Sequence, residues 1–435
     1  MPYNFETSSL WRSTLATVDN DIYSTQRERL CTAYLGLREK IIPLCNRIFS
    51  SFNELTIHDV THLDALWETV SLIAGSDYEL TPLEGFVLGC SFLLHDSALS
   101  YEAFDIAELR GTPEWKDSYA FEHDVNPLLS SEQKEHNADF ATIRILHSKQ
   151  AKYLLMRVLP TSIVGTPDVF LLDDHELRTH LGELIGDIAE SHNWDIEEVE
   201  RKFTAQRNVP AGFPSEWRIQ PLKLACLLRC ADVLHIDSCR APDYLLALFK
   251  RNNISQAHWV AQNHLSKADI DTRDSNGETV IITSDMAFAE SESDAWFVAY
   301  DAISLANKEI IQCNKLLLAK NMNQFKVKRI TGVESPTALS EYVKAEKWKP
   351  SSHELHISNI QDLINNLGGE NLYGKSSDLL RVALRELIQN SRDAVKARKQ
   401  FEESYVPKIA ISFMHDGEDI WLEITEMELG CLSAY

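Results

Sequence analysis

The sequence predicts a mainly α-helical bundle that carries one small β-hairpin and is followed by a shorter α/β segment. Long amphipathic runs with the period of a helix fill most of residues 1–330. Residues 268–283 alternate in polarity on both sides of an Asp-Ser-Asn-Gly turn, which is the pattern of a hairpin. Helix and strand patterns follow one another after residue 353. With 435 residues, the chain has room for two or three domains.

Polar or proline-containing breaks separate the predicted helices of the bundle. These helices cover residues 26–52, 64–74, 83–94, 137–159, 174–191, 220–234 and 294–319. The polar stretch 331–352 predicts a linker between a helical domain, 1–330, and a C-terminal domain, 353–435. The C-terminal part reads as two helices joined by a Gly-Gly loop, followed by strands at 408–415 and 420–425. We expect it to form the opening of an α/β sandwich that is cut short.

Composition predicts a soluble cytoplasmic protein. The formal net charge of -23 argues against general binding to nucleic-acid backbones, because such binding needs a basic face. The N-terminus lacks the charged-then-apolar pattern of a signal peptide, and no apolar run approaches the roughly 20 residues of a membrane span. The eight cysteines are scattered through the chain, and we expect them to be buried thiols rather than a disulfide framework.

Histidines and aspartates recur at intervals through the helical part and predict a metal site. They are His58 and His62 in TIHDVTHLDAL, His95 and Asp96 in LLHDSAL, His147 in IRILHSKQA, His192 in AESHNWD and Asp232 in LRCADVLHIDSCR. Neutral imidazoles and carboxylates suit divalent cations, and a helical bundle supplies such ligands from separate helices. The adjacent His95 and Asp96 follow the apolar run FVLGCSFLL, where burial without a metal or other partners would be costly.

The order of these motifs, over about residues 30–318, resembles that of the HD-domain metal-dependent phosphohydrolases. The resemblance implies one ion held by His62, His95, Asp96 and Asp232, and a second ion held by Asp96, His147 and His192. His58 matches the histidine with which cyclic-nucleotide phosphodiesterases of this fold protonate a leaving oxygen, and we expect it on the helical face of His62. The family often has an aspartate three residues after the last metal aspartate, where this chain has His235. That departure leaves the support of Asp232 in doubt.

The expected reaction is hydrolysis of a nucleotide or another phosphodiester. Two divalent ions would generate a hydroxide from water and clamp the attacking and leaving oxygens. Lys149 and Arg240, which are close in sequence to His147 and Asp232, are candidates for contacts with the substrate phosphate, although each could equally be a solvated surface charge. The ligand types do not distinguish Mn²⁺, Fe²⁺, Zn²⁺, Mg²⁺ and Ni²⁺.

A second motif, ELIQNSRDAV, places Glu386, Asn390 and Asp393 on one face of a predicted helix. It resembles the N-box of the GHKL ATPases, the superfamily of DNA gyrase, heat-shock chaperones, histidine kinases and mismatch-repair ATPases. The resemblance implies that Glu386 polarises a water, Asn390 ligates the Mg²⁺ of Mg-ATP, and Asp393 lines the nucleotide pocket. The alternative is an amphipathic helix whose polar stripe faces solvent.

A GHKL domain also needs a D-x-G-x-G loop after the strand that ends near residue 425, but this chain continues as EMELGCLSAY. A single-base shift of the coding frame could restore a loop of the D-N-G-I-G-M type. We therefore expect a truncation inside the nucleotide site, and weak or no ATP hydrolysis by the chain as it stands.

Three classes of function follow from these motifs. In the first, a metal-dependent phosphohydrolase is regulated by a GHKL module. In the second, the helical part is a metal-stabilised, nucleotide-sensing or chaperone-like scaffold without hydrolase activity. In the third, the chain is a helical interaction protein with chance matches and no tightly bound metal. Because GHKL domains often dimerise, a homo-oligomer is a further expectation.

Overall fold

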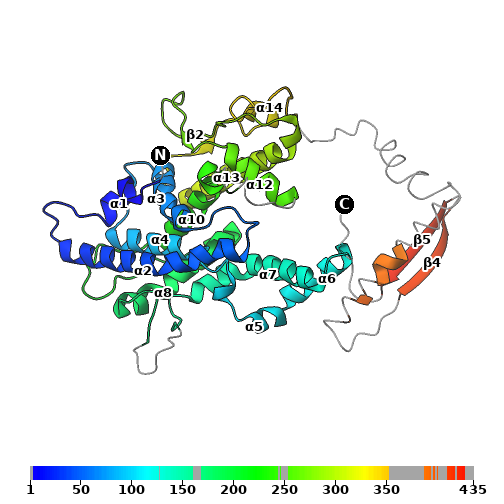
Figure 1. The fold of residues 1–435 in the computed structure, drawn as a ribbon, viewed down its shortest axis with the longest axis horizontal. Coiled ribbons are helices and arrows are strands. Elements are labelled where there is room, and N and C mark those ends of the chain that lie inside the picture. The colour runs from blue at the N-terminus through cyan, green and yellow to red at the C-terminus, as the bar shows by residue number, and fades with distance from the viewer. Residues whose placement is uncertain are drawn as a thin grey trace. The chain divides into compact units, whose positions relative to one another are not determined.

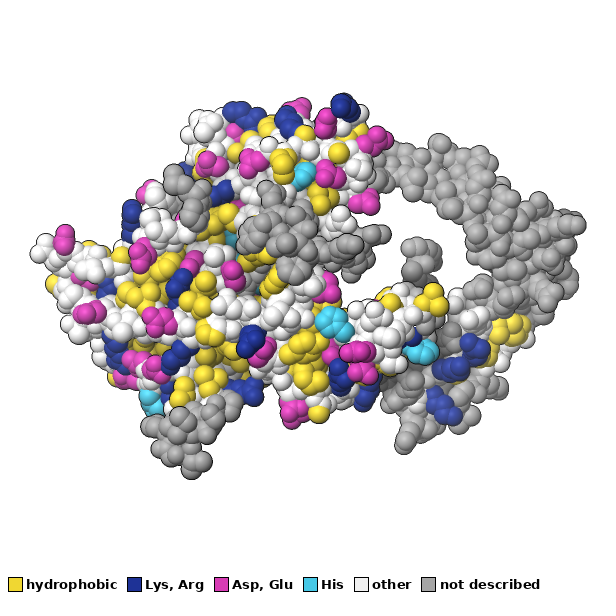
Figure 2. Space-filling model, viewed as in Figure 1, with side chains coloured by type: hydrophobic (Ala, Val, Ile, Leu, Met, Phe, Trp, Pro, Cys, Tyr) yellow, Lys and Arg dark blue, Asp and Glu magenta, His cyan; other side chains and the backbone are white. Residues whose placement is uncertain are grey.

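The chain divides into two compact units, Met1–Ser352 and His353–Tyr435 (Figure 1). The computed structural model describes residues 3–126, 128–159, 168–242, 245, 253–351, 387–392, 395–396, 399, 409–416 and 419–426. Helices dominate the first unit, as predicted. None of its described helices is both long enough and apolar enough to cross a membrane. Acidic and basic side chains are interspersed over the face of this unit that Figure 2 shows.

Helices occupy all seven predicted helical runs of the first unit, although the helix in the run 137–159 ends at Tyr153. The α-helices are α1 (Ser9–Thr14), α2 (Ser24–Ser51), α3 (Val60–Ala74), α4 (Pro82–Leu94), α5 (Ile106–Gly111), α6 (Pro113–Val125), α7 (Ser131–Tyr153), α8 (His175–Glu190), α9 (Ile196–Lys202), α10 (Pro221–Leu234), α12 (Asn253–His264), α13 (Ser293–Ala319) and α14 (Pro336–Leu339). Short 3₁₀ turns are η1 (Phe5–Thr7), η2 (Tyr101–Ala103), η3 (Ser191–Asn193), η4 (Ser238–Arg240) and η5 (Glu290–Glu292). The 3₁₀ turns and the helices of four to seven residues were not expected, because they span too few residues to show a helical period. Helices α6 and α12, of 13 and 12 residues, were not predicted either.

Helix α4 is the central helix of the bundle. A capping box starts it: the Thr81 hydroxyl accepts from the Glu84 amide at 3.1 Å, and the Glu84 carboxylate accepts from the Thr81 amide at 3.0 Å. Every residue of α4 is buried, and the helix packs against α2, α8 and α10. A helix that is apolar all round must be surrounded by others. The residues that follow it, His95 and Asp96, are therefore delivered into the interior.

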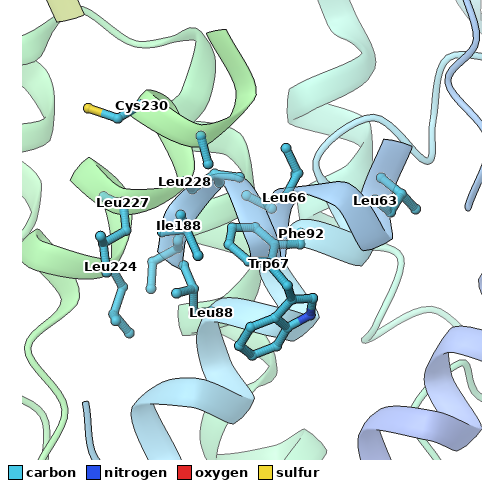
Figure 3. Close-up of a cluster of buried hydrophobic side chains, with 14 of the residues drawn as sticks. Leu63, Leu66, Trp67, Leu88, Phe92, Ile188, Leu224, Leu227, Leu228 and Cys230 are labelled. Atoms are coloured by element: carbon cyan, nitrogen blue, oxygen red, sulfur yellow. The ribbon is translucent and has the colours of Figure 1, made fainter. Parts of the chain in front are cut away.

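The hydrophobic core lies among α3, α4, α8 and α10. Figure 3 shows Trp67 and Phe92 beside Leu88, Ile188 and Leu228. These five side chains are buried completely. Because the helices that carry the predicted metal ligands also share this core, their relative positions are held by close packing.

The predicted hairpin is present as strands β1 (Asp269–Ile270) and β2 (Thr279–Ile281), which pair antiparallel. Gly277 in the connecting turn has a φ of 64°, a left-handed conformation that glycine adopts at little cost. A third strand, β3 (Arg329–Ile330), pairs parallel with β2. The sequence did not predict β3, because two residues carry no readable alternation.

The described part of the predicted linker, 331–351, is not a free linker, and this corrects the expectation from its polar composition. Leu339 and Val343 are fully buried in the first unit. The Trp296 indole of α13 donates to the Val343 carbonyl at 2.9 Å, and the Trp348 indole donates to the Phe288 carbonyl at 2.9 Å. A few apolar side chains thus hold a mostly polar segment against α13.

The second unit contains strands β4 (Ile409–Asp416) and β5 (Asp419–Glu426), which pair antiparallel with Ile409 opposite Glu426. They coincide with the two predicted strands. Asn390 lies exposed on a short helical stretch, 387–392, whereas Glu386 and Asp393 lie outside the described residues. The region after residue 426 also lies outside them. The predicted nucleotide site stays a prediction.

Candidate metal centre

Two groups of side chains in the first unit bring their ligand atoms within 4.8 Å of one another. The first group is His62, His95, Asp96 and Asp232, and the second is Asp96, His147 and His192. Asp96 belongs to both groups. The structure thus brings together all six side chains that the resemblance to the HD-domain enzymes implies as ligands, and Asp96 is shared by the two groups, as that resemblance implies.

Each ligand comes from a packed element of the bundle. His62 lies in the first turn of α3, and His95 and Asp96 follow the last turn of α4. His147 is on α7, His192 in η3 and Asp232 near the end of α10. His62 and His95 are 1% and 0% exposed, so these imidazoles have left water and need polar partners in the interior.

Three of the four histidines are oriented by the same backbone device. The Nδ1 atom of His95 lies 2.9 Å from the Phe92 carbonyl, three residues earlier. His147 and His192 repeat this contact with the carbonyls three residues before them, at 2.8 and 2.6 Å. A carbonyl oxygen can only accept, so the proton of each ring is on Nδ1 and donates to it. This arrangement leaves the Nε2 atoms to bind a cation or a proton.

The Nε2 atoms converge on one another and on the carboxylates. The distance from His147 Nε2 to His192 Nε2 is 3.2 Å, and that from His62 Nε2 to His95 Nε2 is 3.4 Å. Asp96 Oδ2 lies 3.1 Å from His95 Nε2, and Asp96 Oδ1 lies 3.4 Å from His147 Nε2. Facing lone pairs and carboxylates repel unless a proton or a cation lies between them. The donor set of imidazole nitrogens and carboxylate oxygens therefore fits divalent transition-metal ions.

Burial and charge shift the pKa values of four groups in the centre. Burial opposes protonation of His95, but the carboxylates of Asp96 and Asp232 outweigh it and raise its pKa to about 10. Burial likewise opposes ionisation of Asp96 and Asp232, yet the neighbouring histidines hold the pKa of both carboxyls well below the usual range. Burial and then the charge of His95 lower the pKa of His192 to about 4. The centre is thus anionic enough to attract a cation.

Metal affinity is expected to fall as the pH falls. The raised pKa of His95 means that a proton holds its Nε2 atom at every pH below about 10, and a metal ion must displace that proton. Each pH unit below this value should therefore weaken apparent binding by about tenfold. Titration of metal-depleted protein with Mn²⁺ at about pH 6, 7 and 8 measures this dependence. Equal affinity at all three pH values would contradict it.

His58 reaches the centre from the loop before α3 and not from the helix. The predicted helical stacking of His58 under His62 is wrong, because Asp59 caps α3 by accepting from the Thr61 amide at 2.8 Å. His58 Nδ1 lies 2.5 Å from the Thr56 carbonyl, and His58 Nε2 lies 3.9 Å from Asp96 Oδ2. Burial and then the charge of Arg240 lower the pKa of His58 to about 3.

The two candidates for phosphate contacts differ in position. Arg240 is buried beside His58, with its Nε atom donating to the Ile57 carbonyl at 3.2 Å and its Nη1 atom donating to the His235 carbonyl at 3.3 Å. Lys149 is exposed on α7, two residues after His147. Residues two apart on a helix point in nearly opposite directions, so the structure does not bring Lys149 to the centre. Proximity in sequence was a poor guide for this residue.

Arg229 is a buried residue of the centre's surroundings that sequence reasoning missed. Its guanidinium donates to the carbonyls of Ser191 at 2.6 Å and Trp194 at 2.5 Å, which flank His192. The same group pairs with the Glu309 carboxylate of α13 at 2.5 Å. Arg229 therefore fixes the turn that carries His192. Its signal was a lone charge in the apolar run LACLLRCA, three residues before Asp232.

A protein-family model described as HD-CE matches residues 52–312, which is more than half of the chain. The chain belongs to the HD-CE family. Together with the buried histidine and aspartate cluster, this match confirms the HD-like domain that the motif order predicted. The HD-CE match includes every residue of both ligand groups and ends before the C-terminal segment. No curated protein and no solved structure matches the chain.

Proposed function

We propose that the HD-CE domain is a phosphohydrolase that uses two divalent cations to hydrolyse a nucleotide or another phosphodiester. The observation that carries this proposal is the convergence of Nε2 lone pairs and carboxylates, with Asp96 shared between two ligand groups. His62, His95, Asp96 and Asp232 would hold one ion, and Asp96, His147 and His192 the other. When bound, such ions lower the pKa of coordinated water and neutralise charge on phosphate oxygens.

The other polar groups beside the centre fit a phosphate substrate. Arg240 presents a buried positive charge next to His58, and a guanidinium suits the oxygens of a phosphate. The lowered pKa of His58 makes the neutral ring its resting form. A bound phosphate would supply the negative charge that favours the protonated ring, which could then donate to the leaving oxygen.

Hydrolysis of bis-p-nitrophenyl phosphate by the Mn²⁺-loaded chain tests the proposal. The His58→Asn variant is expected to lose about 10²–10⁴-fold in kcat, because it lacks the proton donor, while its Mn²⁺ content stays at the wild-type value. As a control, His123→Asn changes an exposed histidine of α6 and should leave kcat unchanged. Equal kcat in the wild type and His58→Asn would remove His58 from the mechanism.

The same experiment separates the enzyme from the scaffold. A chain that binds two ions yet hydrolyses neither this ester, nor nucleotides, nor nucleic acid would be a metal-stabilised scaffold. A chain that binds no ion would be a helical interaction protein. The Mg-ATP site at Glu386, Asn390 and Asp393, the regulation of the hydrolase by it, and the formation of a homo-oligomer remain predictions from the sequence.

A further inference from the structure

His62 is the one histidine of the two ligand groups that no backbone carbonyl orients through its Nδ1 atom among the described contacts. Instead, its Nδ1 atom lies 2.7 Å from Nδ1 of His235. The planes of the two rings are nearly parallel, with an interplanar angle of 3° and centroids 5.0 Å apart, so the two nitrogens meet edge to edge. His235 is the C-cap residue of α10. Its side chain thus has the role for His62 that backbone carbonyls have for the Nδ1 atoms of His95, His147 and His192.

Two ring nitrogens at this distance form a hydrogen bond through one proton. The chemistry of the metal centre indicates which ring donates that proton. For His62 Nε2 to bind a cation, the His62 proton must be on Nδ1, where it can only be donated to His235 Nδ1. His235 then carries its own proton on Nε2. That atom is buried, makes no hydrogen bond among the described residues, and lies 3.9 Å from Asp237 Oδ1.

The N-terminal segment contacts both His235 and Asp237 through Tyr3. The Tyr3 hydroxyl donates to Asp237 Oδ2, and the Tyr3 ring meets the His235 ring edge-on with centroids 4.9 Å apart. The Lys267 ammonium lies 4.0 Å from the centre of the Tyr3 ring and pairs with Glu68. Glu68 also accepts from the Asn4 amide at 2.5 Å. Residues from four separate parts of the chain therefore fix one imidazole.

We propose that His235 is a positioning residue that sets the tautomer and orientation of His62, and that Tyr3 and Asp237 lock His235 in that role. This inference rests on the proposed metal site but not on hydrolase activity. It explains how the chain manages without the aspartate expected three residues after Asp232. Here a second imidazole, that of His235, contacts the ligand His62, and the carboxylate of Asp237 lies beside His235 instead of contacting a ligand directly.

Mn²⁺ titration of the metal-depleted full-length chain, followed by the electron paramagnetic resonance of free Mn²⁺, tests the role of His235. His235→Phe keeps a ring but removes the acceptor, and it should weaken one of the two ions by about 10–100-fold. His235→Asn places an amide oxygen near the position of Nδ1 and should restore affinity to within about threefold of the wild type. Equal losses in both variants, or no loss in His235→Phe, would overturn the proposal.

Tyr3 supplies a test that leaves the buried rings intact. Tyr3→Phe removes only the hydroxyl that binds Asp237, and it should weaken the same ion by a smaller factor than His235→Phe. Tyr23→Phe is the matched control, because the Tyr23 hydroxyl donates to Glu216 at the surface. Equal affinity in the two tyrosine variants would overturn the role of the N-terminal segment.

The outcomes distinguish this inference from the proposed function. If His235→Phe fails to fold, as far-ultraviolet circular dichroism would show, His235→Asn and Tyr3→Phe still decide the matter. A wild-type chain that binds two Mn²⁺ ions but shows no hydrolysis would leave the role of His235 standing and overturn the enzyme. A wild-type chain that binds no Mn²⁺ would overturn both.

Discussion

Asp96→Asn is expected to release both ions of the proposed two-ion centre, because Asp96 is the one residue common to the two ligand groups. The amide keeps the size of the side chain but carries no charge, so both imidazole clusters lose the carboxylate that balances a cation. Hydrolysis should fall on the order of a thousandfold or more, since bound metal contributes several kcal/mol to the transition state and each 1.4 kcal/mol is tenfold. Elemental analysis and the bis-p-nitrophenyl phosphate assay measure the two effects.

Two further variants sharpen this experiment. His147→Ala removes a ligand of only the second group, so it should lose one ion and keep the other. Asp117→Asn removes the same charge from an exposed site on α6 and should retain both ions and full activity. An Asp96→Asn protein that still binds two ions would show that Asp96 does not bridge, and the two-ion centre would have to be abandoned.

Arg229→Met is expected to destabilise the first unit by about 3–5 kcal/mol, the cost of breaking a buried ion pair from one side. Arg229 and Glu309 each have side chains only 8% exposed, so the variant strands a carboxylate in the interior. It also removes the donor that satisfies the carbonyls of Ser191 and Trp194. Urea unfolding followed by circular dichroism measures the loss of stability.

Two control variants accompany this prediction. One also replaces Glu309, the partner of Arg229, and the other replaces an exposed arginine. Arg229→Met combined with Glu309→Leu leaves no buried charge and should recover part of the lost stability. Arg218→Met, at an exposed position, should stay within about 0.5 kcal/mol of the wild type. A loss below about 1 kcal/mol in Arg229→Met would contradict a bracing role. With the turn around His192 released, the same variant should also bind its second ion more weakly.

Much of the centre could be predicted because its ligands lie in short motifs at the ends of strongly patterned helices. The apolar run before His95 ends where α4 ends, and Asp232 lies in the last turn of α10, a helix that is mostly buried. Such local signals need no knowledge of distant residues. The position of Lys149 depends on helix phase, so its closeness in sequence to His147 did not show where it lies. His58 does reach the centre, but it comes from the loop before the capped start of α3 and not from the predicted helical face.

The segment 331–352 illustrates a different failure. Its composition is that of a linker, yet Leu339 and Val343 are buried against helices from elsewhere in the chain. Whether two apolar side chains are enough to dock a polar segment depends on the surface that receives them, and that surface is assembled only in the fold. The same holds for Arg229, whose charge is tolerated in α10 because Glu309 and two carbonyls lie opposite.

The sequence by itself determined the helical class, the hairpin and the six candidate ligands, because periodicity, short motifs and the order of those motifs can be read along the chain. Only the tertiary structure decided that Asp96 belongs to both ligand groups, that backbone carbonyls turn three Nε2 atoms inward, and that His235 faces His62. These are relations in distance and direction between residues far apart in the chain. These relations arise only when the helices pack around a common core, so a pattern in neighbouring residues does not predict them.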